Sequence, residues 1–498
     1  MGENVTTFIV GLLILVFGGA LYGKFCEKLF GIDDRTTCAY SKEDGIDYVP
    51  MPLWKNSLIQ LLNIAGTGPI LGPLMGILFG PVAFIAIPVG CVLSGAVHDY
   101  MSGMISMREN GAQMPNMIRK YMGKGVFGIY NILVCVVLLL VGAVFVYTPG
   151  DIFVSQILGQ STAQTNPTVW IVYGVIFVYY LIATLFPIDK VIGRLYPLFG
   201  AVLLVSAIGV FFGLFVNGDF VLENLTFANL LGNYTTAGRT NTNPLVPIFF
   251  VTVACGITSG FHSTQSTLIS RTIKSERQGR MAYFNMMLAE GFIAMVWAAA
   301  GMGLYKQLGF DAKLVGTAPV IGIIARQMLG PVGGLIAIIG IIVLPITSGD
   351  TGLRALRLII GETLKIDQKK LGKRLGLSAV IFVIVALILY WAKSSASGFS
   401  ILWRYFAWSN QTLATFTFGL STVYLIVANK RKNAFLVALL PGSFYLFTIL
   451  TFILNSKIGF NLPWIITYPL GGAFTLATVV WVLYHARKLE KLDVVAMA

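Results

Sequence analysis

Apolar residues fill thirteen stretches of this sequence, each about long enough to cross a lipid bilayer, and mostly short polar segments separate them. A helix needs about 20 predominantly apolar residues to span the hydrocarbon core. The pattern therefore predicts an all-α polytopic membrane protein with about thirteen transmembrane helices and no attached soluble domain. The expected spans are residues 6–23, 56–79, 81–107, 125–148, 169–187, 192–216, 244–269, 281–305, 330–353, 375–392, 401–428, 433–455 and 464–485.

Positive charge is concentrated in alternate loops, which predicts how the chain is oriented. With the N-terminus outside, 28 of the 35 Lys and Arg residues fall in the cytoplasmic segments 24–55, 108–124, 188–194, 270–280, 354–374, 429–432 and the tail after 485. Cytoplasmic loops carry such an excess under the positive-inside rule. We expect a multi-pass protein of the cell (plasma) membrane with its C-terminus in the cytoplasm. The net charge of +14 then reflects loops that face anionic lipid, and no nucleic-acid partner is expected.

Two of the expected spans are interrupted at corresponding places by glycine and proline. The first contains Gly66-Thr67-Gly68-Pro69, and the second contains Gly256-Ile257-Thr258-Ser259-Gly260 about 190 residues later. Glycine loosens a helical backbone and proline lacks an N–H, so each segment should unwind for a few residues. Unwound backbone at membrane depth is tolerated only where it lines a polar cavity. A pair of such breaks in two halves of a chain indicates a binding site of a transporter near the bilayer midplane.

A second pair of matching sequences suggests an internal repeat. Tyr147-Thr148-Pro149-Gly150-Asp151 and Ile346-Thr347-Ser348-Gly349-Asp350 each fall at the end of an expected span. Residues 56–216 and 244–428 then form two five-helix units. Because each unit has an odd number of spans, the two units must enter the membrane from opposite sides. The remaining segments are an N-terminal accessory helix and cytoplasmic loop (1–55) and two C-terminal accessory helices with a tail (429–498). The alternative is chance recurrence of glycine-rich peptides in a chain with 54 glycines.

Ionisable residues inside the spans are candidates for function, because each costs roughly 2.5–3.5 kcal/mol to insert. They are His98, Asp99, His262, Glu290, Asp350 and Arg404. His98 and Asp99 are adjacent and point about 100° apart on a helix, so we expect each to meet a different neighbour. Histidine titrates near neutral pH, which favours a proton relay or a coupling-ion ligand. A buried polar lock between helices is the alternative.

The second break carries an unusual number of polar side chains, and we expect it to supply most of the side-chain recognition of a substrate. Its candidate residues are Thr258, Ser259, Gly260, His262 and Ser263. N–H groups and hydroxyls at the start of a half-helix suit a carboxylate or a peptide backbone. The first break is expected to contribute chiefly backbone groups of Gly66, Thr67 and Gly68. Hydroxyls that only hold two helices together are the alternative.

Other polar residues suggest ion coupling and an outer entrance. Thr347, Ser348 and Asp350 offer the oxygen ligands that suit a proton or Na⁺, although Asp350 can instead pair with Arg354 one turn later. Arg404, Asn410 and Gln411 concentrate donors near the expected outer mouth, where they can meet an anionic substrate.

Metal binding and catalysis receive little support. His98 and His262 are the candidate metal ligands, but they lie on different spans without ligand spacing. No nucleotide-binding or catalytic motif appears. We expect a non-enzyme that needs no cofactor and is driven by an ion gradient, with H⁺ the expected coupling ion and Na⁺ the alternative.

Five motifs in this order resemble the carbon starvation protein A (CstA) family of peptide and pyruvate transporters. They are Ala65-Gly66-Thr67-Gly68-Pro69-Ile70-Leu71-Gly72-Pro73, Gly95-Ala96-Val97-His98-Asp99, Gly256-Ile257-Thr258-Ser259-Gly260-Phe261-His262-Ser263, Thr347-Ser348-Gly349-Asp350, and Trp403-Arg404-Tyr405 with Trp408-Ser409-Asn410-Gln411. The resemblance implies membership of the amino acid–polyamine–organocation superfamily, with a LeuT-like core of inverted five-helix repeats. It also implies uptake of small peptides or pyruvate-like carboxylates.

Residues and resemblance together predict a secondary active importer, proton-coupled and working by alternating access. Its partners would be the lipid bilayer and a small-molecule or peptide substrate, and the sequence does not define an oligomeric state. The alternatives are a channel or facilitator for the same solutes and a membrane nutrient sensor.

Overall fold

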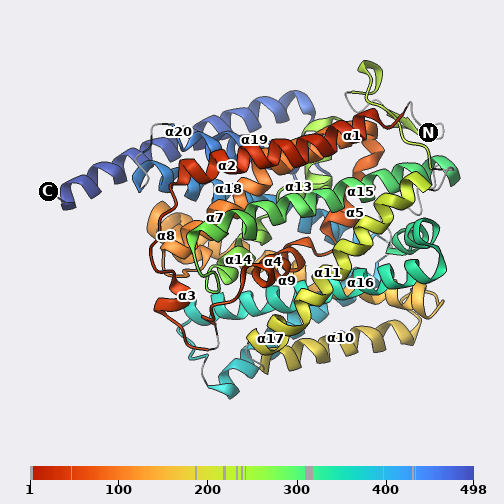
Figure 1. Ribbon diagram of the computed structural model, residues 1–498, viewed down its shortest axis with the longest axis horizontal. Coiled ribbons are helices and arrows are strands. Elements are labelled where there is room, and N and C mark those ends of the chain that lie inside the picture. The colour runs from red at the N-terminus through yellow and green to blue at the C-terminus, as the bar shows by residue number, and fades with distance from the viewer. Residues whose placement is uncertain are drawn as a thin grey trace.

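The computed structural model describes residues 4–45, 47–185, 188–216, 220–230, 234–236, 239–241, 243–308, 318–368, 370–395, 397–428, 431 and 433–497. Most long helices run along the longest axis of the molecule, and the N- and C-terminal ends of the chain lie at opposite ends of that axis (Figure 1). The predicted all-helical membrane architecture is confirmed. We call the end that carries α3 (Cys38–Ser41) and α8 (Met114–Met122) the inner end, because these helices fall in loops predicted to be cytoplasmic.

Within its described residues, the first half of the chain has helices as its only regular secondary structure. Its other elements are α1 (Thr6–Leu13), η1 (Ile14–Gly18), α2 (Gly19–Phe30), α4 (Leu53–Ala65), α5 (Gly68–Gly76), η2 (Ile77–Val82), α6 (Ala83–Gly90), η3 (Cys91–Gly95), α7 (Ala96–Arg108), α9 (Lys124–Ile152), η4 (Phe153–Ile157), α10 (Pro167–Leu185) and α11 (Ile188–Val216). Here η marks a short 3₁₀ or π-helical segment.

The second half begins with a small hairpin, in which β1 (Tyr234–Thr236) pairs antiparallel with β2 (Arg239–Asn241). Helices make up the rest. They are η5 (Phe227–Asn229), η6 (Leu245–Phe249), α12 (Phe250–Thr252), α13 (Ala254–Ile257), α14 (Gly260–Ile269), η7 (Glu276–Gln278), η8 (Arg280–Phe284), α15 (Asn285–Leu308), α16 (Ala318–Thr363), α17 (Leu371–Ser394), α18 (Gly398–Val427), α19 (Leu436–Asn455) and α20 (Trp464–Met497).

Within the described ranges, nine helical stretches are long and apolar enough to cross a membrane. The first break separates α4 from one of these stretches, Gly68–Arg108, and the broken segment 244–269 is not among the nine because it is divided into shorter helices. The count of thirteen spans, the inverted repeat and its domain boundaries stay predictions.

Several predicted helix ends are wrong, and two of these errors have the same cause. The predicted loop 188–194 belongs to a helix, because α11 begins at Ile188. The predicted end of a span near Asp350 lies inside α16, which continues to Thr363. Hydropathy marks where a helix leaves the lipid, whereas Leu, Lys and Arg have good helix propensity and let it continue into water. Thr148–Asp151, by contrast, does lie at the end of α9.

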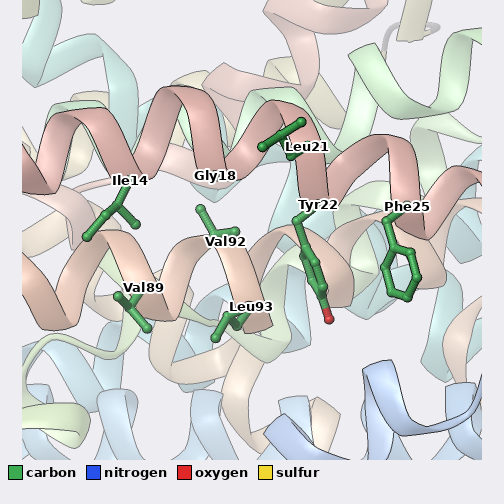
Figure 2. Close-up of a pocket in the computed structure, with 8 residues that line it drawn as sticks. All are labelled: Ile14, Gly18, Leu21, Tyr22, Phe25, Val89, Val92 and Leu93. Atoms are coloured by element: carbon green, nitrogen blue, oxygen red, sulfur yellow. The ribbon is translucent and has the colours of Figure 1, made fainter.

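A shallow apolar groove lies between the first helix and its neighbour. It encloses about 440 Å³, and Figure 2 shows side chains from η1 and α2 facing those of α6 and η3 across it. Its lining residues are Ile14, Gly18, Leu21, Tyr22, Phe25, Val89, Val92 and Leu93. Exposed apolar side chains such as Val16, Phe17 and Leu21 continue this surface. In a bilayer, such a face is covered by lipid chains.

Candidate functional site

Both predicted interruptions are present, and each is two residues long. Gly66 and Thr67 separate α4 from α5, and Gly66 adopts φ 46° and ψ −148°, which a side chain would strain. A Cβ on Gly66 would also lie 2.7 Å from the Phe145 ring. In the second break, Thr258 and Ser259 are extended between α13 and α14.

Glycines bring the two breaks against each other. A Cβ on Gly68, at the start of α5, would lie only 2.1 Å from the Cβ of Cys255 in α13. Such a separation is possible only for glycine, so the backbones of the two broken helices are in close contact here. The predicted substrate residues of the two halves therefore lie at one place, and the labels of α4 and α14 fall together near the middle of the molecule (Figure 1).

Asn410 of α18 closes the start of the half-helix α14. Its Oδ1 accepts hydrogen bonds from the Phe261 N–H (3.2 Å) and the Ser259 hydroxyl (3.3 Å), and its Nδ2 donates to the Phe406 carbonyl (2.9 Å). This side chain satisfies the Phe261 N–H, one of the backbone donors that a helix start leaves without partners.

The expected outer-mouth group of Arg404, Asn410 and Gln411 is not a single cluster. Asn410 and Gln411 are buried, and Gln411 donates to the Phe250 carbonyl at 2.6 Å. Arg404 is exposed on α18. Six residues of helix place Arg404 about 9 Å along the axis from Asn410. The prediction grouped the three residues because they are close in sequence, but in the fold Arg404 is exposed and the other two are buried.

We expect Asn410→Ala to lower the free energy of unfolding by about 1 kcal/mol, because the Phe261 N–H and the Ser259 hydroxyl lose their acceptor. Thermal unfolding of the detergent-purified protein measures this loss. Asn116→Ala is the matched control, since Asn116 is exposed and its side-chain amide donates to the exposed carboxylate of Glu362. Equal unfolding temperatures for both variants would contradict the capping role.

Four buried ionisable side chains form a chain beside the second break. His98 Nδ1 lies 2.8 Å from Asp99 Oδ1, and Asp99 Oδ2 lies 3.2 Å from His262 Nδ1. His262 Nε2 is 3.6 Å from Glu290 Oε2. α7, α14 and α15 supply these residues, and none is more than 1% exposed. Three helices thus share one line of titratable groups.

The prediction that His98 and Asp99 do not pair is wrong. Their backbone positions diverge as expected, but the imidazole can turn across the helix surface until Nδ1 reaches the neighbouring carboxylate. Asp99 also meets His262, so it joins two histidines. Glu290 is recognisable as an intramembrane charge in the sequence, but only the fold connects it to the other three.

Several hydroxyls expected to bind substrate bond within the protein. The Thr258 hydroxyl lies 2.8 Å from Ser94 Oγ and donates to the Ile257 carbonyl, and the Ser263 hydroxyl donates to the Gly260 carbonyl at 2.6 Å. The Thr67 hydroxyl is buried and, within the part of the chain that the structure describes, has no hydrogen-bond partner.

Sequence reasoning missed a polar stripe on α4. Asn56, Gln60 and Asn63 are spaced by four and three residues, which places them on one face of α4. Thr67 follows in the break, and all four residues are buried. Gln60 donates to Ser266 Oγ of α14 at 3.0 Å. Gln60 Oε1 and Asn63 Oδ1 have no partner among the described residues. The spacing was the available signal.

The candidate ion residues approach the first break from α16. The Ser348 hydroxyl donates to the Leu62 carbonyl in the last turn of α4 at 2.9 Å, and the Thr347 hydroxyl donates to the Leu344 carbonyl at 2.8 Å. Thr347, Ser348 and Asp350 are all buried. Among the described residues, no group of three or more His, Cys, Asp or Glu is arranged to hold a metal ion.

The segment between α2 and α4, residues 31–52, covers the inner ends of α7 and α14. Met51 N–H donates to the Thr272 carbonyl at 2.9 Å, and the Thr37 hydroxyl donates to the Ile273 carbonyl at 2.7 Å. Glu276 fixes the same segment, because it accepts the Asp33 N–H at 3.0 Å. We call residues 31–45 and 47–52, together with Glu276 and Arg108, the inner lock.

Arg108 holds the inner lock by a bidentate ion pair. Its Nε and Nη2 donate to the two carboxylate oxygens of Glu276 at 2.8 Å each, and Glu276 is fully buried. Arg35 adds a contact of 3.4 Å to Glu276, and its hydrogen bonds to Asp33 lower the pKa of that carboxyl. The lock ties the chain before α4 to the loop after α14.

A second buried ion pair lies at the C-terminal end of α9. Lys393 Nζ is 2.8 and 2.7 Å from the two carboxylate oxygens of Asp151, and the Tyr173 hydroxyl donates to Asp151 at 2.7 Å. Lys393 also lies 4.5 Å from the centre of the Tyr147 ring. α9, α10 and α17 are thereby joined where α9 ends.

The amino-acid sequence is similar to a known protein family and to several of its members. The family model described as carbon starvation protein CstA matches residues 3–182, 148–322 and 306–452. An uncharacterized membrane protein of Haemophilus influenzae is 42% identical over 344 residues, covering 60% of this chain and 91% of that protein. The peptide transporter CstA of Escherichia coli is 24% identical over 597 residues, covering 92% and 83%. The pyruvate/proton symporter BtsT of the same organism is 28% identical over 340 residues, covering 56% of this chain and 46% of that protein.

Solved structures share the fold. A crystal structure of the Eremococcus coleocola manganese transporter, in complex with an aromatic bis-isothiourea substituted compound, superposes with a TM-score of 0.63 and covers 90% of this chain and 99% of that one. The two sequences are 10% identical. At this identity, the likeness concerns the arrangement of helices alone.

Proposed function

The chain belongs to the carbon starvation protein CstA family, and on that premise we propose that it is a secondary active transporter that imports pyruvate-like carboxylates or small peptides together with protons. The resemblance found in its five motifs is thereby confirmed, and its relatives are transporters rather than enzymes. The observation that carries the proposal is the chain His98–Asp99–His262–Glu290 beside two broken helices. We further propose that it works in the cell (plasma) membrane, with the N-terminus outside.

The substrate position that we propose lies between the two breaks. α5 and α14 both begin there, and the start of a helix carries a partial positive charge that attracts a carboxylate. The unpartnered Thr67 hydroxyl and the Asn63 amide add side-chain contacts beside the first break. Thr258 and His262 adjoin the second break, where we expected most of the side-chain recognition.

Protons are the proposed coupling ions, because His98, Asp99 and His262 are joined by hydrogen bonds in the apolar interior. An isolated fixed charge is costly in the apolar interior. A row of hydrogen-bonded titratable groups can instead pass a proton from one group to the next, with each group next to a partner. Sodium remains the alternative. Its proposed site is beside Ser348, where the hydroxyl meets a carbonyl at the end of α4.

Alternating access requires that the inner end opens and closes. We propose that the inner lock is the element that closes this end, because its residues bond the segment that follows α14. A channel or facilitator would equilibrate the solute without accumulating it, and a nutrient sensor would bind the solute without moving it. Accumulation against a gradient therefore separates the proposed function from both alternatives.

Ligand-dependent stabilisation of the purified protein tests the substrate class. At roughly 100 times its dissociation constant, a ligand stabilises the folded state by about 2.7 kcal/mol. We expect pyruvate or a dialanine peptide to raise the unfolding temperature, and Mn²⁺ alone to leave it unchanged. His262→Ala and Thr258→Ala should remove the effect, whereas His485→Ala, a histidine on α20, should retain it.

Uptake into proteoliposomes tests the coupling. We expect labelled substrate to accumulate when the medium is made acidic relative to the lumen, and a proton ionophore to abolish the accumulation. A sodium gradient alone should have no effect. Transport that ignores both the proton and the sodium gradient would exclude symport.

A further inference from the structure

Glu290 differs from every other member of the buried chain because its carboxyl group accepts no hydrogen bond from the residues that the structure describes. Both of its oxygens are buried and have no partner among the residues that the structure describes. The nearest ionisable atom is His262 Nε2, at 3.6 Å from Oε2, which is too long for a hydrogen bond. His262 Nε2 likewise has no hydrogen-bond partner within the described ranges.

A second buried glutamate in the same chain shows what a structural carboxylate looks like here. Glu276 is also fully buried, but it accepts two hydrogen bonds from Arg108 and one from the Asp33 N–H. Its charge is therefore compensated. Glu290 has no such compensation, so a purely architectural role does not explain why a carboxyl group occupies this position.

The surroundings of Glu290 favour protonation as the means of neutralising it. The titratable groups that act on it are His262 from α14, Asp99 from α7, and the thiols of Cys91 from η3 and Cys255 from α13. His262 alone among these can carry a positive charge. An isolated carboxylate in such a site is costly, whereas the neutral acid is not.

We propose that Glu290 is the terminal proton-binding residue of the coupling pathway and exchanges its proton with His262 during transport. This inference rests on the proposed proton-coupled function and adds a residue to it. It requires the two side chains to approach from 3.6 Å to hydrogen-bonding distance.

The proposed transfer is balanced in protons and charge. The Glu290 O–H bond breaks and a His262 Nε2–H bond forms, which leaves a carboxylate beside an imidazolium. The imidazolium then releases its Nδ1 proton to Asp99 Oδ2, 3.2 Å away, and becomes neutral again. The proton has moved from α15 across α14 to α7, and no redox partner is needed.

Glu290→Gln tests the proposal because glutamine keeps the shape of the side chain but cannot exchange a proton. With the membrane potential clamped, an inward pH gradient of about one unit permits roughly tenfold accumulation if one proton accompanies each substrate. We expect the wild-type protein to approach this value and Glu290→Gln to show no accumulation. Substrate counterflow, which needs no net proton movement, should persist in the variant.

Glu362→Gln is the matched control, since Glu362 lies exposed near the end of α16, and we expect it to behave as the wild type in both assays. Glu290→Asp retains a carboxyl group and should accumulate substrate, with a shifted pH dependence. If Glu290→Gln fails to fold, as judged by size-exclusion chromatography, Glu290→Asp becomes the decisive variant: accumulation with a shifted pH profile supports the proposal, and an unchanged profile contradicts it.

The possible failures are distinguishable. If the wild type performs counterflow but ignores the pH gradient, proton coupling itself is wrong, and the role of Glu290 falls with it. If the wild type and Glu290→Gln accumulate substrate equally, the proposed function stands and the role of Glu290 is wrong. If a folded Glu290→Gln protein loses both counterflow and accumulation, Glu290 is assigned to substrate binding instead and the proposal is overturned.

Discussion

Asp99→Asn is expected to abolish accumulation of substrate driven by a pH gradient. Asp99 lies within hydrogen-bonding distance of two other members of the buried chain, with one carboxylate oxygen 2.8 Å from His98 and the other 3.2 Å from His262. An amide of the same shape cannot accept and release a proton. With one unit of pH gradient, roughly tenfold accumulation should fall to none.

The same variant should also be less stable wherever His262 carries a proton, because the imidazolium then loses its compensating carboxylate. Uptake into proteoliposomes and thermal unfolding measure the two effects separately. Glu362→Gln is the control, since Glu362 is exposed near the end of α16, outside both the buried chain and the inner lock. Normal accumulation by Asp99→Asn would exclude Asp99 from the proton path.

Glu276→Ala is expected to open the inner lock. Removing one partner of a buried ion pair typically costs 3–5 kcal/mol, and the partial exposure of Arg108 and Arg35 places the expected loss near the lower end, at about 3 kcal/mol. The native Cys38 thiol reports the opening, because Cys38 is buried in the lock and donates to the Ser270 carbonyl. Burial raises the pKa of this thiol, which suppresses its reaction while the lock is closed.

Alkylation of Cys38 by N-ethylmaleimide, followed by mass spectrometry of its peptide, should therefore be faster in Glu276→Ala than in the wild type. Asp34→Asn removes an exposed ion pair with Arg277 in the same region and should leave the rate unchanged. Equal rates in Glu276→Ala and Asp34→Asn would contradict the lock.

Acidification within the working range should not open the inner lock by titrating Asp33. The pKa of Asp33 is lowered by its hydrogen bonds to Arg35. A lowered carboxyl pKa stabilises the folded arrangement above the ordinary value of about 3.9, and this contribution is lost only as the pH falls through the lowered pKa. Cys38 labelling between pH 6 and pH 8, corrected for thiolate content, should show no added opening at the acidic end.

Local chemistry explains which parts of the site could be predicted from the sequence. Gly66 and the Thr258-Ser259 pair mark breaks because backbone conformation is set by residues close in sequence. The buried positions of His98, Asp99, His262 and Glu290 follow from charges in apolar spans. Membership of the family followed from the motifs, and the all-helical class followed from hydropathy.

Contacts between distant helices could not be predicted in the same way. Asn410 was assigned to an outer entrance because of its neighbour Arg404, yet α18 carries it to the start of α14. His98 and Asp99 were separated by ideal helix geometry, which ignores the reach of an imidazole ring. The end of α16 was missed because the bilayer boundary and the helix end are different things.

The polar stripe of α4 determines how easily the inner half of that helix can move. Its buried face carries Asn56, Gln60 and Asn63, and Gln60 donates a hydrogen bond to the Ser266 hydroxyl of α14. Separating two apolar faces would expose surface at about 25 cal/mol per Å², but amides and hydroxyls exchange their protein contacts for hydrogen bonds to water. Hydrogen bonds to water thus replace most of the hydrogen bonds that the closed packing provides. A small difference in ligand or proton binding is then enough to decide whether water enters between α4 and α14.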